Sequence, residues 1–165
     1  MFVVVASAFR ASWEPEREDL GGALETALRD RGHEVDSLRI PFDPDPDALW
    51  SQLFAVRMTN ISDVGELLVA TDAPCHLLRH RHKVLWLTEH YPWLEDESAA
   101  LGSLSTADRQ ALGEARAAFA VSRRLQERIA RSSGSGVGLL SPPGRGSWDR
   151  VIGTLIGIDS GSGSR

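Results

Sequence analysis

Two short segments carry the side chains best suited to bind a ligand or move a proton. In the stretch Thr-Glu-His-Tyr-Pro-Trp, residues 88–93, the carboxylate of Glu89 stands beside the imidazole of His90, directly after an apolar run. An imidazole changes its charge near neutral pH, and a carboxylate accepts hydrogen bonds from hydroxyl groups. The same pair also fits a polar loop beside aromatic residues. Both interpretations stay open at this point.

Histidines cluster in the second segment, residues 75–83, Cys-His-Leu-Leu-Arg-His-Arg-His-Lys. His76 and His80 are four residues apart, so a helix would place both on one face, as a metal pair requires. No third ligand follows at a defined spacing. The single cysteine, Cys75, excludes a cysteine-based zinc cage and an internal disulfide. We predict no metal site: the segment is interpreted as a solvated, positively charged helix end, and Cys75 as a small buried apolar residue.

The glycine pair Gly21-Gly22 raises the question of a phosphate-binding loop. In a dinucleotide-binding fold the glycines follow the first strand directly, but here that strand is predicted to end about fifteen residues earlier. Leucines recur at helical spacing from 20 to 28, so we predict that the pair lies inside a helix and allows close packing on a sheet. We therefore expect no phosphate loop and no bound cofactor.

These residues must be positioned by strands and helices that alternate along the chain. Apolar runs predict strands at 2–6, 34–40, 65–71, 83–88, 117–122 and 136–141. Helical spacing and start signals predict helices at 20–31, 45–58, 105–117, 122–132 and 147–158. This alternation is typical of a parallel sheet. We predict an α/β fold with a single domain, a three-layer, doubly wound, Rossmann-like parallel sheet.

Ligands of such sheets bind beyond the carboxyl ends of the strands. The loop after the first strand, residues 7–19, offers Arg10 for ligand binding, but it also carries four carboxylates that would repel a diphosphate. Ser122 ends the fifth strand and is either a cleft residue or the N-cap of the next helix. Arg10, Glu89, His90 and Ser122 are therefore the predicted ligand-binding residues.

Composition limits the class of protein. The chain of 165 residues is long enough for one domain with a sizeable core, and its net charge of −5 argues against a nucleic-acid partner. No apolar run approaches the roughly 20 residues of a membrane span, and the first residues are typical of a strand and not of a secretory signal. We expect a cytoplasmic protein. The Gly/Ser-rich residues 159–165 are predicted to form a disordered tail.

Four segments together resemble a known family. In chain order they are LETALRDRGHEVDSLRIPF (24–42), KVLWLTEHYPWL (83–94), ADRQALGEARAAFAVSRRLQERI (107–129) and VGLLSPP (137–143). Their order and spacing are similar to the N-terminal half of retaining family-4 glycosyltransferases, over residues 1–143. The resemblance implies one of the two facing Rossmann-like domains of the GT-B fold, the one that binds the acceptor. It also implies a cleft histidine near His90 and a cleft serine at Ser122.

The chain also departs from that family. The family's glycine pair would fall near Pro15-Glu16, and the nucleotide-sugar domain would follow residue 143. Instead residues 147–158 follow, and they resemble the helix that closes such enzymes by returning to the N-terminal domain. The resemblance therefore implies a domain that binds a sugar or small-molecule acceptor. It implies no catalytic residues here and no activity unless a nucleotide-sugar-binding domain acts in trans.

Two alternatives remain beside the glycosyltransferase reading. The chain is equally compatible with a minimal Rossmann-like scaffold or binding module that has no enzymatic role. A third possibility is a flavodoxin-like enzyme for a small ligand. The sequence contains neither the phosphate loop nor the acid-base constellation that would support it.

Overall fold

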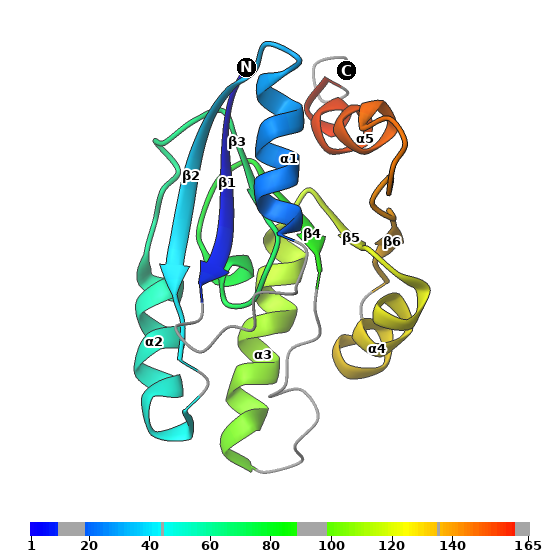
Figure 1. Cartoon of the computed structure of the whole chain (residues 1–165). Coiled ribbons are helices and arrows are strands. Elements are labelled where there is room, and N and C mark those ends of the chain that lie inside the picture. Colours follow the sequence, from blue (N-terminus) through cyan, green and yellow to red (C-terminus); the bar gives the residue numbers. More distant parts are fainter. Residues whose placement is uncertain (10–18, 44, 89–98, 135, 161–165) are drawn as a thin grey trace, which may run out of the picture.

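The computed structural model describes residues 1–9, 19–43, 45–88, 99–134 and 136–160. Six parallel strands form one sheet with helices on both of its faces (Figure 1). The elements follow the chain as β1 (Phe2–Phe9), α1 (Leu20–Arg29), β2 (Glu34–Pro41), α2 (Pro46–Met58), β3 (Leu67–Ala70), the short 3-10 helix η1 (Cys75–Leu77), β4 (Lys83–Leu87), α3 (Ala99–Glu114), β5 (Ala117–Ala120), α4 (Arg123–Ser133), β6 (Gly138–Leu139) and α5 (Asp149–Ser160).

The strand order is β2-β1-β3-β4-β5-β6, and every neighbouring pair is parallel. From β1 the chain first moves outward to β2, and it then crosses to β3 on the other side of β1. This reversal between β1 and β3 is the point at which doubly wound sheets bind ligands. The predicted fold class, a Rossmann-like α/β domain with a parallel sheet, is therefore confirmed.

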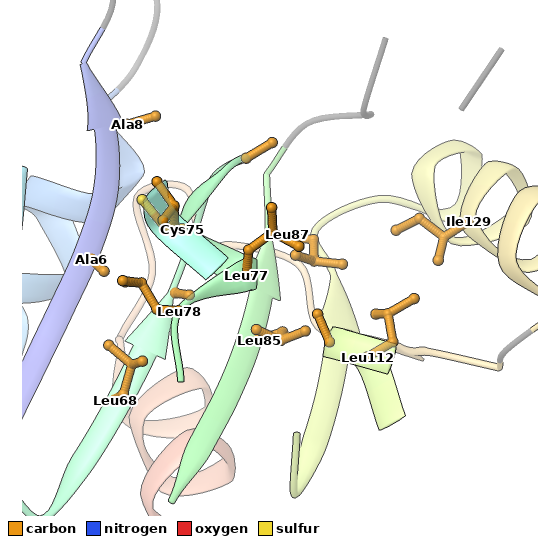
Figure 2. Close-up of a cluster of buried hydrophobic side chains, with 14 of the residues drawn as sticks. Ala6, Ala8, Leu68, Cys75, Leu77, Leu78, Leu85, Leu87, Leu112 and Ile129 are labelled. Atoms are coloured by element: carbon orange, nitrogen blue, oxygen red, sulfur yellow. The ribbon is translucent and has the colours of Figure 1, made fainter. Parts of the chain in front are cut away.

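Side chains that alternate along the strands enter two hydrophobic layers. The first layer, drawn in Figure 2, packs the sheet against α2, η1, α3 and α4, and its strand residues include Val4, Ala6, Leu68, Leu85 and Leu87. The second layer packs the opposite face against α1 and α5, and its strand residues include Val3, Val5, Val69, Val84 and Trp86. Every residue of β3 and β4 is buried, which explains their continuous apolar runs.

Helix α5 completes the second layer. Its Val151, Ile152 and Leu155 are buried in the same cluster as Trp86, which is fully buried. The indole Nε1–H of Trp86 donates to the carbonyl of Leu140 at 2.8 Å. The helix was predicted at 147–158 but runs from Asp149 to Ser160, so it starts two residues later and includes two residues of the expected tail. The remaining tail residues, 161–165, lie outside the described residues.

One helix starts earlier than the sequence predicted. Helix α3 begins at Ala99, and Ser105 lies inside it instead of capping it. The prediction took Ser105 as the N-cap, because serine favours that position. In the structure the Asp108 carboxylate is buried and lies 2.5 Å from His76 Nε2, so it serves a tertiary contact.

Replacing Leu155 with alanine tests whether α5 is part of the core. Leu155 is 1% exposed, so Leu155→Ala should lower the free energy of unfolding by about 2–5 kcal/mol, measured by urea denaturation. Leu139→Ala makes the same change at a side chain that is 38% exposed and should cost less than about 1 kcal/mol. Equal losses at the two positions would contradict a docked α5.

Candidate functional site

The carboxyl ends of three neighbouring strands bring three hydroxyl groups and a carboxylate to one edge of the sheet. Ser7 of β1 and Thr71, which follows β3, are 1% and 0% exposed. Asp72 and Thr88, at the ends of β3 and β4, are half-buried. These residues surround the reversal between β1 and β3, so the topology makes this edge the candidate ligand site.

The Asp72 carboxylate is held by the two threonines. Thr71 Oγ1 lies 3.1 Å from Asp72 Oδ2, and Thr88 Oγ1 hydrogen-bonds to Asp72 Oδ1. Each hydroxyl also has a carbonyl within reach, because Thr71 Oγ1 is 3.3 Å from Ala6 O and Thr88 Oγ1 is 3.1 Å from Thr71 O. A carboxylate has about four acceptor positions, so Asp72 can still accept hydrogen bonds from a ligand.

On the other side of β1, Arg39 of β2 joins Ser7 to the start of α1. Its Nη1 donates to Ser7 Oγ at 2.5 Å and lies 3.4 Å from Asp19 Oδ1. Its Nη2 donates to Glu25 Oε1 at 3.0 Å, and Glu25 is only 5% exposed. Two carboxylates therefore balance the charge of Arg39, and little positive potential is left here for a phosphate.

The glycine pair lies inside α1, in its first turn, as the sequence predicted. Asp19 caps the helix, because Gly22 N donates to Asp19 Oδ1 at 2.9 Å. A Cβ on Gly22 would lie 2.6 Å from Asp19 Oδ2, whereas one on Gly21 would lie 3.4 Å from Ser7 Cβ, an ordinary contact. The cap carboxylate thus occupies the position from which a phosphate would reach these amides.

Of the four predicted ligand residues, Ser122 falls in the part of the chain that the structure describes. Its hydroxyl accepts a hydrogen bond from Leu125 N at 3.2 Å, so Ser122 is the N-cap of α4, one of the two roles considered for it. Arg10, Glu89 and His90 lie outside the described residues. Sequence reasoning missed Asp72. The signal was present, because the apolar run of β3 ends in Thr-Asp at the same edge.

The histidine segment is buried, so the prediction of a solvated helix end was wrong. His76 and Lys83 are 0% exposed and His80 is 6% exposed. Only η1 is helical in this segment, and it packs in the first hydrophobic layer. The chain then turns into β4, so these side chains are buried. Burial lowers the pKa of His80. Cys75 is buried, as predicted. Among the described residues no group of three or more His, Cys, Asp and Glu side chains is placed to hold a metal ion.

Lys83, the only lysine of the chain, is held by backbone carbonyls and an ion pair. Its Nζ donates to His76 O at 2.9 Å and to Leu78 O at 3.0 Å, and it lies 3.9 Å from Glu114 Oε2. Arg57 binds the same carboxylate through both guanidinium nitrogens, which lowers the pKa of Glu114 and raises that of Arg57. Burial lowers the pKa of Lys83 to about 8. Because Lys83 begins β4, this cluster lies at the amino edge, away from the candidate site.

No family model, curated protein or solved structure matches the chain. None of the described helices is long and apolar enough to cross a membrane.

Alanine at each glycine of the pair separates a capping role from a phosphate-binding one. Gly21→Ala should be neutral or stabilising, because its Cβ makes only ordinary contacts and alanine favours the helix. Gly22→Ala displaces the Asp19 cap and should be less stable than Gly21→Ala by about 1 kcal/mol in urea denaturation. Equal stability of the two variants would contradict the role of Asp19 as the cap.

The buried lysine should make stability rise with pH. An unfolded lysine titrates near pH 10.4, whereas the pKa of Lys83 in the fold is about 8. Between these values the unfolded chain binds more protons, so the contribution of Lys83 grows as pH rises, by about 3 kcal/mol in total. The neutral amine still has two N–H groups for its two carbonyl partners.

Lys83→Met is the reference for this measurement. The unfolding free energy of the natural chain minus that of Lys83→Met should increase from pH 8 to pH 10.5. All other titrating groups are common to both proteins, so the increase reports on Lys83. A difference that stays constant over this range would show that Lys83 has an ordinary pKa.

Proposed function

We propose that this chain is the acceptor-binding domain of a retaining glycosyltransferase, which holds a hydroxyl-bearing acceptor while a separate domain supplies the nucleotide sugar. The observation that carries the proposal is Asp72, a half-buried carboxylate that two threonines orient at the reversal of the sheet. Sugars present several hydroxyl donors, and an oriented carboxylate is a strong acceptor for them. The four sequence segments that resemble this enzyme family support the same function.

The carboxyl edge is better suited to a neutral polyhydroxy ligand than to a nucleotide. Asp19 occupies the first amides of α1, and Arg39 is bound to Glu25 and lies close to Asp19. Among the described residues at the start of α1, a diphosphate would approach carboxylates and no cation that lacks a carboxylate partner. A sugar hydroxyl, which is uncharged, meets no such repulsion. The nucleotide sugar would therefore bind to the other domain.

A single acceptor-binding domain should not transfer sugar alone. Much of the rate in such transfers comes from holding both reactants in position, and one wall of a cleft holds only one of them. We expect neither transfer from nor hydrolysis of a nucleotide sugar above the blank with this chain. Turnover by this chain would contradict the proposal.

The binding site can be tested by NMR titration of the isotope-labelled chain with simple mono- and disaccharides and, separately, with uridine diphosphate. Saccharides at millimolar concentration should shift the amide signals of Ser7, Thr71, Asp72 and Thr88, and the nucleotide should not. Asp72→Asn keeps the shape of the side chain but removes its charge. It should weaken saccharide binding about tenfold, the loss of roughly 1.4 kcal/mol from a charge-assisted hydrogen bond.

Asp36→Asn, at an exposed carboxylate on the edge strand β2, is the matched control and should leave binding unchanged. Shifts caused by the nucleotide at these same amides would contradict the proposal that the nucleotide sugar binds to the other domain. A folded chain that responds to no saccharide would favour the scaffold alternative.

A further inference from the structure

Helix α2 presents an apolar face to solvent. Trp50, Phe54 and Met58 are 43%, 67% and 59% exposed. Residues four apart lie on the same side of a helix, so these three side chains form a continuous strip along α2. We call this strip the α2 ridge (Trp50, Phe54, Met58).

The core does not use the α2 ridge. The opposite side of α2 already contributes Leu53 and Val56 to the first hydrophobic layer. A surface helix normally has one apolar stripe, whereas α2 has two. Single exposed apolar residues are ordinary, but three large ones in a row are typical of an interaction surface.

The two ends of α2 carry opposite charges. Asp45 and Asp47 are exposed at its start. At its end, Arg79 and Arg81 are exposed, and Arg79 lies beside the helix because its backbone N–H donates to Thr59 O at 3.1 Å. Arg81 also lies 3.9 Å from the exposed carboxylate of Asp63, so Arg79 is the main positive charge of this end. The α2 ridge thus runs from an acidic end to a basic end.

We propose that the α2 ridge binds a second copy of this chain about a two-fold axis at Phe54. A two-fold axis pairs identical surfaces, so the two helices cross with opposite directions. Trp50 and Met58 are equally far from Phe54 in the sequence. The axis therefore places Trp50 of each copy on Met58 of the other and packs the two Phe54 rings together.

Charge complementarity favours this occupant. The antiparallel arrangement brings the acidic start of each α2, with Asp45 and Asp47, to the basic end of the other, with Arg79 and Arg81. It also opposes the two helix dipoles. A parallel arrangement would bring like charges together, which costs affinity.

The size of the α2 ridge predicts a weak dimer. Each large side chain of the ridge offers on the order of 100 Å² of exposed surface, so two copies bury roughly 600 Å² through the ridge. This is less than the roughly 1,200 Å² at which stable interfaces begin. The dimer should therefore form only at concentrations above ~10 μM.

Sedimentation velocity of the whole chain from about 5 to 500 μM tests the proposal. The natural chain should shift from monomer to dimer over this range. Phe54→Glu places two carboxylates at the axis and should weaken self-association at least tenfold. Leu139→Glu introduces the same charge at another exposed apolar residue, outside the ridge, and should leave self-association unchanged. Thermal melting of both variants shows whether they remain folded.

A charge exchange tests the antiparallel arrangement. Asp47→Arg should weaken the dimer, and adding Arg79→Asp to that variant should restore it. A monomer at every concentration, a dimer that Phe54→Glu leaves unchanged, or a failed restoration would overturn the proposal. Binding of monomers to phosphatidylcholine vesicles that Phe54→Glu abolishes would overturn it in favour of a lipid surface.

Discussion

The right-handedness of the crossovers between parallel strands governs which face of the sheet each helix can cover. The connection from β1 to β2 runs in one direction and places α1 on one face. Every later crossover runs in the other direction, so α2, η1, α3 and α4 lie on the opposite face. Strands β3 and β4 are buried on both faces, and none of the crossover helices that the structure describes packs on the α1 side of β4. Helix α5 covers this side of β4 and packs on the fully buried Trp86. Its Asp149 also pairs with Arg31, which follows α1 in the chain, at 2.5 Å.

The same reversal of direction creates the candidate site. Strands β1 and β3 lie side by side, and the helix that follows β1, α1, packs on one face of the sheet, whereas η1, which follows β3, packs on the other. Doubly wound sheets bind ligands at such a reversal, where Ser7, Thr71 and Asp72 lie. Ser7 and Thr71 are buried and must have hydrogen-bond partners, which Arg39 and the Asp72 carboxylate supply. Asp72 is therefore held by groups fixed to the sheet. A site built on strand ends holds its geometry better than one built on loops.

The sequence predicted the fold well because its strongest signals are local. Continuous apolar runs between helical patterns are typical of a parallel sheet covered on both faces, and the six predicted strands all exist, with shifted ends. The buried polar residues were not predictable in the same way. Asp108 falls within a predicted helix, but no local pattern indicated that it binds His76, which is 32 residues away in the chain. In the sequence, Lys83 and the histidines are typical of surface charges. In the fold, Lys83, His76 and His80 are buried where the chain turns from η1 into β4. Such partners are set by tertiary contacts, which a local pattern does not contain.

Repulsion, and not only attraction, shapes what can bind at the carboxyl edge. Nucleotide-binding sheets leave the first amides of a helix open to phosphate, but here Asp19 occupies them. Two unit charges 4 Å apart at a partly solvated site interact by on the order of 4 kcal/mol. A phosphate at that distance from Asp19 would therefore lose roughly a thousandfold in affinity, since each 1.4 kcal/mol is a factor of ten. A hydroxyl ligand meets no such penalty and can donate to Asp72. The carboxylates of this edge thus disfavour phosphate, which agrees with the neutral, hydroxyl-rich acceptor that we propose.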